Sequence, residues 1–288
     1  MYREVNQLAL EVKKLLQHAG LKATKSLGQH FLADEKYLTA TVSAAEISPQ
    51  DIVIEIGPGL GVLTEELVKK AEKVIAVEVD GRLVSFLKKR FVSYRNFDLV
   101  HADILKTDLS RLLGGQYSYK VVANLPYYIT SPVLHYFVGA VPRPSLMVVM
   151  VQKEVAEAIT GSAGKMTAFG VGLHVYSNSS IVSYVPAQSF YPPPKVDSAI
   201  VRFDFLPAPA VSVTDIEDFL KFVRYGFTSP RKQMRNSLAQ GLNVKPVLID
   251  SLLDRAGIES RRRPETLDLQ EWERLYTCAN TENLEVFQ

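Results

Sequence analysis

The chain has 288 residues, of which 47% are hydrophobic and 22% are charged, and its net charge of +2 is small, as in many globular proteins. The apolar run over residues 146–151 is far too short to cross a membrane, and the first residues lack the apolar segment and cleavage site of a signal peptide. The single cysteine, Cys278, excludes an intrachain disulfide and a metal cluster held by cysteines. We therefore expect a cytoplasmic protein with one large and one small domain.

The first part of the chain contains the opening of a nucleotide-binding unit. Apolar residues at helical spacing predict an amphipathic helix over residues 3–18. A predicted strand over residues 51–56 ends in the loop Gly57-Pro58-Gly59-Leu60-Gly61, after which a helical period begins. Strand, glycine loop and helix in this order are typical of a βαβ unit whose glycines let a ligand approach the backbone at the helix N-terminus.

The spacing around this loop discriminates between two cofactor classes. A second predicted strand, residues 74–77, ends in Glu78, which follows Gly57 by 21 residues, the usual distance for a carboxylate that binds ribose hydroxyls. A dinucleotide fingerprint requires its third glycine at position 62, where this chain has Val62. The pattern therefore favours S-adenosylmethionine over NAD, and a nicotinamide oxidoreductase is a distant alternative.

Two further strand ends carry polar groups. The predicted strand over residues 98–102, which follows a predicted helix over 82–91, ends at Asp103. Its carboxylate can accept a hydrogen bond from the adenine amine of the cofactor. The next strand, residues 119–123, leads directly into Asn124-Leu125-Pro126-Tyr127. The Asn124 side chain and the Leu125 carbonyl supply two acceptors for an exocyclic amine, and Tyr127 supplies a face for base stacking.

The rest of the first predicted domain completes the sheet. Residues 146–151 form a fifth predicted strand, and residues 153–176 are predicted to be helical with an interruption near 161–164. Two closing strands are predicted over 180–185 and 196–205. Three prolines between these strands predict a stiff, extended loop that holds Phe190 in place at low entropic cost.

After a proline-containing linker at residues 207–209, the pattern is helical. The helices are predicted over residues 214–228, 230–240, 244–256 and 268–279. We therefore divide the chain into a catalytic domain over residues 1–206 and a helical domain over 207–288. Residues 221–263 contain ten Lys or Arg against three acidic residues, a net charge of +7 that indicates a polyanionic partner. Arg231, Lys232 and Arg235 are predicted to share one face of a helix and to bind RNA.

With these pieces placed, six blocks of sequence resemble the ribosomal small-subunit RNA adenine N6,N6-dimethyltransferases, run in the order of that family and cover nearly the whole chain. They are Lys25–Leu32, Glu55–Gly61, Asn124–Tyr127, Gln152–Ala156, Phe190–Val201 and Arg231–Leu238. The resemblance implies an α/β fold with a Rossmann-like class I methyltransferase sheet, helices on both faces of this sheet, and a small all-helical C-terminal domain. It also implies a methyltransferase active in rRNA processing and ribosome biogenesis.

The resemblance assigns roles by position. The residues implied to contact S-adenosylmethionine are His30, Leu32, Gly57, Glu78, Asp103 and Asn124. Those implied to act on the target base are Asn124, Leu125, Pro126, Tyr127 and Phe190. The implied substrate is a pair of adjacent adenines in the 3′-terminal hairpin loop of 16S rRNA, within an immature 30S subunit. The enzyme is expected to act as a monomer without a metal or a membrane.

Three departures from the family and two alternatives accompany this interpretation. His30 is asparagine in many members, Ala158 is often arginine, and the segment Gly161–Gly172 matches poorly. The nearest alternative is a large-subunit rRNA methyltransferase of the kind that confers macrolide resistance, in which isoleucine tends to replace Leu125. The other is a non-enzymatic nucleic-acid-binding protein on the same scaffold, against which the glycine loop, Glu78 and Asn124 argue.

Overall fold

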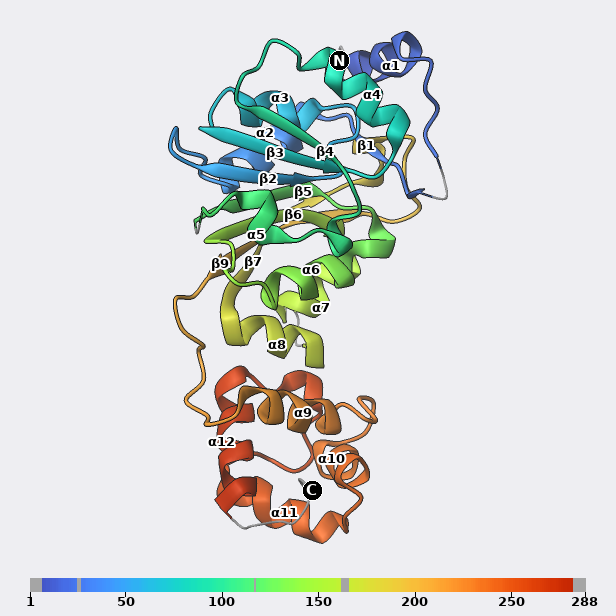
Figure 1. Cartoon of the computed structure of the whole chain (residues 1–288). Coiled ribbons are helices and arrows are strands. Elements are labelled where there is room, and N and C mark those ends of the chain that lie inside the picture. The colour runs from blue at the N-terminus through green and yellow to red at the C-terminus, as the bar shows by residue number, and fades with distance from the viewer. Residues whose placement is uncertain (1–6, 25–26, 117, 162–165, 282–288) are drawn as a thin grey trace. The chain divides into compact units, whose positions relative to one another are not determined.

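The computed structural model describes residues 7–24, 27–116, 118–161 and 166–281 (Figure 1). Contacts group the chain into two compact units, one of residues 1–156 with 180–205 and the other of residues 157–179 with 206–288. The predicted division after residue 206 stays a prediction. The contacts differ from it in grouping residues 157–179 with the C-terminal helices, because a helix in this segment packs on two of those helices.

The first unit is built on a mixed sheet of seven strands (Figure 1). In their order across the sheet, the strands are β4 (Phe97–His101), β3 (Lys73–Glu78), β2 (Ile52–Ile56), β5 (Lys120–Asn124), β6 (Leu146–Gln152), β9 (Ser198–Phe205) and β7 (Ser177–Val185). β2 to β6 are parallel, and β9 runs antiparallel to β6. Each of the five parallel strands lies within one residue of its predicted range, so the predicted α/β fold is confirmed.

Four of the parallel strands, β2, β3, β5 and β6, form because both of their faces are buried, whereas β4 is an edge strand without a buried residue. Neighbouring residues such as Val53 and Ile54, or Val121 and Val122, are completely inaccessible to solvent although their side chains point to opposite faces. One face packs against four helices in a single hydrophobic cluster. These helices are α1 (Gln7–His18), α2 (Glu35–Ala44), α3 (Val62–Val68) and α4 (Gly81–Arg90). Figure 1 shows α5 (Leu109–Leu113) and α6 (Thr130–Val138) on the other side of the sheet.

A second, two-stranded sheet joins distant parts of this unit. In it β1 (Phe31–Leu32) pairs antiparallel with β8 (Phe190–Tyr191), so that Leu32 lies opposite Phe190. The sequence predicted neither strand, and it also predicted neither α2 nor α6. The small sheet brings the predicted cofactor-contacting segment beside the predicted base-contacting Phe190.

The second unit is helical. Its helices include α8 (Ala168–Tyr176), α9 (Ile216–Gly226), α10 (Met234–Leu242), α11 (Pro246–Arg255) and α12 (Leu269–Thr281). They surround a core in which Trp272, Phe219 and Phe222 are completely buried. α7 (Lys153–Thr160) and α8 confirm two helical segments within residues 153–176, and residues 162–165 of the predicted interruption lie outside the described residues.

One prediction for the second unit is wrong. α10 begins at Met234, so Arg231 and Lys232 lie in the preceding turn and do not share a helical face with Arg235. The helix cannot begin earlier because Gln233 is extended, with ψ 151°, and because the Met234 amide donates a hydrogen bond to the carbonyl of Arg262. Within the described part of the chain, no helix is long and apolar enough to cross a membrane.

The glycine loop gives a test of the packing of the first unit. Gly61 has φ +79°, and a Cβ at this position would lie 2.5 Å from the Phe91 ring. Gly114 has φ +59°, but a Cβ there would meet nothing within 4 Å. We expect Gly114→Ala to lower the free energy of unfolding by about 1–2 kcal/mol through backbone strain alone. Gly61→Ala should cost a further ~1–3 kcal/mol through overpacking.

Urea unfolding followed by circular dichroism measures both losses. Equal destabilisation by the two substitutions would show that the Phe91 ring moves aside at no cost, contrary to the close packing described here.

Candidate active site

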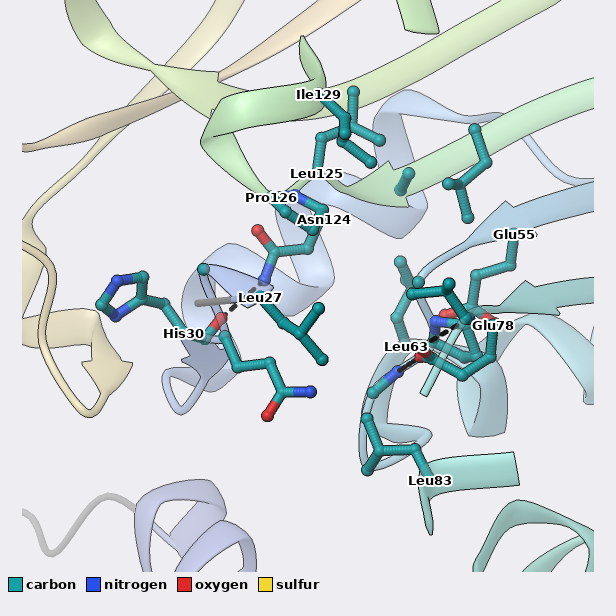
Figure 2. Close-up of a pocket in the computed structure, with 18 of the residues that line it drawn as sticks. Leu27, His30, Glu55, Leu63, Glu78, Leu83, Asn124, Leu125, Pro126 and Ile129 are labelled. Atoms are coloured by element: carbon teal, nitrogen blue, oxygen red, sulfur yellow. Dashed lines mark hydrogen bonds between the residues drawn. The ribbon is translucent and has the colours of Figure 1, made fainter. Parts of the chain in front are cut away.

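A single pocket collects the predicted site residues of the first unit (Figure 2). Its cavity volume is about 330 Å³, and it lies where β2, β3, β4 and β5 end. All ten predicted cofactor and target-base residues line it. They are His30, Leu32, Gly57, Glu78, Asp103, Asn124, Leu125, Pro126, Tyr127 and Phe190. The carboxyl ends of adjacent parallel strands are where open α/β sheets bind ligands, so the sheet explains this convergence.

The glycine loop forms one wall of the pocket. Gly57, Gly59 and Gly61 all have positive φ values, of 63°, 59° and 79°. A Cβ on Gly59 would lie 3.1 Å from the Phe31 ring, a tight contact, and the φ of +59° would strain any residue with a side chain. At Gly57 and Gly59 the loop therefore presents backbone to the pocket, and Pro58 and Leu60 line the pocket beside them.

Glu78 fixes this loop. One oxygen of its carboxylate accepts a hydrogen bond from the Gly59 amide at 3.3 Å, and the other accepts from the amides of Val79 and Asp80 at 2.9 Å each. The side chain is buried, and this burial raises the pKa of Glu78 above its ordinary value. The loop contact is a structural role that the sequence interpretation did not include.

A clamp missed by the sequence analysis holds the loop before β1 against α4. The Asp80 carboxylate accepts hydrogen bonds from Gln29 and from the Arg82 guanidinium, which also donates to the hydroxyl of Thr24. The Arg82 guanidinium holds the pKa of Asp80 down at about 2. Since Gln29 lines the pocket, this clamp positions one of its walls.

Glu55 is the second buried carboxyl group of the pocket, and it was also missed. It is only 1% exposed and accepts a hydrogen bond of 2.6 Å from the Thr64 hydroxyl. Desolvation, reinforced by the nearby charge of Glu78, raises the pKa of Glu55 to about 8. Its sequence signal is a charged residue inside an otherwise apolar strand, a position that needs a compensating partner.

Asn124 is held in one orientation. Its Nδ2 donates a hydrogen bond of 3.1 Å to the backbone carbonyl of His30, as Figure 2 shows. This bond determines which way the Asn124 amide is turned, because only its nitrogen can donate to a carbonyl. The bond therefore leaves Oδ1 as an acceptor. Beside it, the Leu125 amide donates to the carbonyl of Met150, while none of the described residues donates a hydrogen bond to the Leu125 carbonyl.

Aromatic side chains stand next to these acceptors. The Tyr127 hydroxyl is 2.8 Å from the Ser198 hydroxyl, and Phe190 is buried on β8. The His30 ring stacks on Tyr127 with a centroid distance of 5.9 Å, and its Nδ1 donates to the carbonyl of Pro192 at 2.7 Å. The His30 side chain thus ties the loop before β1 to the proline-rich segment. Its expected contact with a cofactor stays a prediction.

The remaining predicted residues belong to two different places. Asp103 lies at the pocket edge, where one carboxylate oxygen accepts from the Leu105 amide. Arg231, Lys232 and Arg235 belong to the second unit and do not line this pocket. No group of His, Cys, Asp or Glu that could hold a metal ion occurs among the residues that the structure describes.

Comparison with known proteins shows extensive sequence similarity. Residues 20–275 match the model of the family described as ribosomal RNA adenine dimethylase. The chain is 49% identical over 268 residues to the ribosomal RNA small subunit methyltransferase A of Dehalococcoides mccartyi, covering 93% of this chain and 92% of that one. It is 39% identical over 271 residues to the protein of the same name from Clostridium botulinum, covering 93% and 98%.

Solved structures show the same fold. The crystal structure of the 23S rRNA methyltransferase ErmE superimposes with a TM-score of 0.74 at 28% identity, covering 87% of this chain and 99% of that one. A dimethyladenosine transferase from Plasmodium falciparum gives a TM-score of 0.73 at 27% identity, covering 88% and 98%. The extent of both superpositions agrees with the predicted sheet and C-terminal helices.

The buried carboxyl group of Glu55 predicts a pH dependence of stability. The folded protein keeps this proton up to about pH 8, whereas the unfolded chain releases it near the ordinary pKa of 4.5. The Glu55 contribution to stability is therefore complete below about pH 4.5, and it is lost as the pH rises to about 8, by up to ~1.4 kcal/mol per pH unit. Urea unfolding between pH 4.5 and 8.5 should show this loss.

Two variants test whether the Glu55 carboxyl group causes this pH dependence. Glu55→Gln should lack this component of the pH dependence, because it has no proton to release. Thr64→Val removes a hydrogen bond that lowers the pKa of Glu55, so the loss should extend to higher pH. The same pH dependence in wild type and in Glu55→Gln would contradict the assignment.

Proposed function

The chain belongs to the ribosomal RNA adenine dimethylase family, and from this membership we propose how its pocket and its basic second unit act on RNA. It is an rRNA adenine dimethyltransferase. The substrate proposed here is a pair of adjacent adenines in the 3′-terminal hairpin loop of 16S rRNA, within an immature 30S subunit, with the enzyme acting as a monomer. The 49% identity to a small subunit methyltransferase supports this substrate over 23S rRNA, since ErmE is only 28% identical.

The pocket of the first unit fits S-adenosylmethionine as the methyl donor. Gly57 and Gly59 of the glycine loop line the pocket without side chains, and the Glu78 carboxylate beside them can accept hydrogen bonds from ribose hydroxyls. The apolar side chains of Leu83 and Ile104 and the Asp103 carboxylate suit an adenine ring and its amine. When bound, this cofactor supplies an electrophilic methyl group on a sulfonium. We place His30, Leu32, Gly57 and Asn124 among its contacts as well.

The single observation that carries the proposal is the orientation of Asn124. Its Oδ1 and the Leu125 carbonyl are acceptors that can bind the two hydrogens of the adenine N6 amine. The N6 lone pair is ordinarily delocalised into the ring, and holding the hydrogens out of the ring plane localises this pair on nitrogen. Tyr127 and Phe190 can stack on the two faces of the base and recover part of the cost of removing it from the RNA stack.

The proposed reaction needs orientation more than acid–base chemistry. N6 attacks the methyl carbon while the carbon–sulfur bond breaks, and the methylated nitrogen then releases its extra proton to solvent. The buried carboxyl groups of Glu55 and Glu78 are already hydrogen-bonded to Thr64 and to backbone amides, so their present contacts are structural. Positioning of the two reactants therefore supplies most of the rate.

The second unit is proposed to bind rRNA phosphates. Arg231 and Lys232 are exposed in the turn before α10. Arg235 pairs with Asp250 at 3.3 Å, so its contribution to RNA binding is proposed to be smaller than theirs. This proposal replaces the predicted shared face of a helix with a basic turn.

Asn124→Ala tests the proposed function. With saturating S-adenosylmethionine and unmethylated small subunits, wild type should dimethylate both adenines, as primer extension detects. Asn124→Ala should lower the single-turnover rate at least ~10²-fold, the scale of losing one oriented polar group in a dry site. Binding to the subunit should survive.

Asn96→Ala is a matched control for this substitution. The Asn96 amide also donates to backbone carbonyls, those of Val68 and Ala71, but it lies outside the pocket. It should lower stability without changing the single-turnover rate of the folded protein. Near wild-type dimethylation by Asn124→Ala would refute the proposed mechanism.

Glu78→Gln tests the proposed cofactor site. The substitution keeps the size of the side chain but removes a charged acceptor, so calorimetry should show at least about tenfold weaker binding of S-adenosylmethionine. NAD should not bind measurably to either protein. Glu66→Gln on α3, whose carboxylate pairs with Lys69 at the surface, is the control and should bind the cofactor as wild type does. Unchanged affinity in Glu78→Gln would place the ribose elsewhere.

A further inference from the structure

An exposed tyrosine and a lysine form a pair on the first unit that the proposed function does not yet use. Nζ of Lys153, the residue that follows β6, lies 5.1 Å from the centroid of the Tyr184 ring on β7. Tyr184 is 46% exposed, and Val182 on the same face of the strand is 41% exposed. A cation beside an accessible aromatic ring is a combination that binds a base and its phosphate.

Contacts connect this pair to the wall of the active-site pocket. The Lys153 amide donates a hydrogen bond of 3.0 Å to the carbonyl of Asp197. The next residue, Ser198, lies opposite Gln152 in the sheet, and its hydroxyl is 2.8 Å from the hydroxyl of Tyr127. Lys153 therefore directly follows Gln152, the residue that pairs with Ser198, and Ser198 in turn contacts Tyr127, the proposed stacking residue.

The carboxylate of Asp197, the residue whose carbonyl binds the Lys153 amide, makes a hydrogen bond of its own. Asp197 accepts a hydrogen bond from the Ala187 amide at 3.0 Å through its side chain. The ammonium group of Lys153 instead lies over the aromatic ring, where a phosphate oxygen can reach it from solvent. Loops of single-stranded RNA, whose bases are unstacked, bind to such surfaces through stacking and phosphate contacts.

We propose that Lys153 and Tyr184 bind a single-stranded RNA nucleotide that flanks the target adenine, the base stacking on Tyr184 and the phosphate pairing with Lys153. This inference rests on the proposed function, which supplies the RNA and the position of the target base. It assigns a binding role to the first unit, in addition to the basic turn of the second. It also gives a role to Lys153 in the block Gln152–Ala156, which the family resemblance singled out without a role.

The test measures methyl transfer to unmethylated small subunits over a range of subunit concentrations. Tyr184→Ala should raise the concentration needed for half-maximal transfer about tenfold, the effect of losing one stacked base. Tyr184→Phe keeps the ring and should behave as wild type. Lys153→Gln should also weaken binding, and the slope of log affinity against log salt should decrease by about one unit.

The single-turnover rate at saturating subunit should not change in these variants, because neither residue lines the pocket. Calorimetric affinity for S-adenosylmethionine should not change for the same reason.

Lys36→Gln is the matched control. Lys36 makes the same kind of contact, with Nζ 5.1 Å from the centroid of the Tyr37 ring, but Tyr37 is only 7% exposed and offers no face to a base. This variant should keep wild-type half-saturation and salt dependence. A loss equal to that of Lys153→Gln would show a nonspecific charge effect and overturn the proposal.

The outcomes separate this inference from the proposed function. If wild type transfers no methyl group to the subunit, the proposed function fails. If wild type is active but Tyr184→Ala has wild-type half-saturation, only the nucleotide contact is refuted. An equal loss in Tyr184→Phe and Tyr184→Ala would also refute it, because the phenylalanine ring retains the stacking face.

Discussion

The hydrogen bond from the Asn124 amide to the His30 carbonyl is the constraint on which the active-site pocket depends. It joins the end of a central strand to the segment that enters β1, and β1 in turn pairs with the strand that carries Phe190. The same bond uses the amide nitrogen and leaves the oxygen as an acceptor, the group that we propose binds the substrate amine. One contact therefore sets both the chemistry of Asn124 and the position of the neighbouring walls.

The parts of this site that could be predicted are those determined by short-range pattern. Apolar runs predicted the parallel strands, and Glu78, Asp103 and Asn124 then fall at one edge because parallel strands end together. The pairing of β1 with β8 could not be predicted, since each strand has two residues and the pair is far apart in the chain. The start of α10 was placed too early because the pattern does not show that Gln233 is extended.

The two buried carboxyl groups of the pocket, those of Glu55 and Glu78, are each stabilised by hydrogen bonds. A charged carboxylate in an apolar interior is costly unless it is hydrogen-bonded or protonated. Glu78 meets this condition with three backbone amides, and Glu55 meets it with the Thr64 hydroxyl and a raised pKa of about 8. The strand pattern shows that Glu55 needs a partner, but it does not identify the partners of either residue, because these come from turns and helices that follow the strands.

The hydrogen bonds that the pocket side chains already make limit the chemistry that the pocket can perform. Glu55 and Glu78 are held by the fold, and the Tyr127 hydroxyl is paired with Ser198. The acceptors at Asn124 and Leu125 are oriented by backbone contacts, so the proposed binding of a base there would need little further ordering. A preorganised pair of acceptors selects an exocyclic amine by geometry, since a carbonyl oxygen in its place would meet two acceptors without a hydrogen between them.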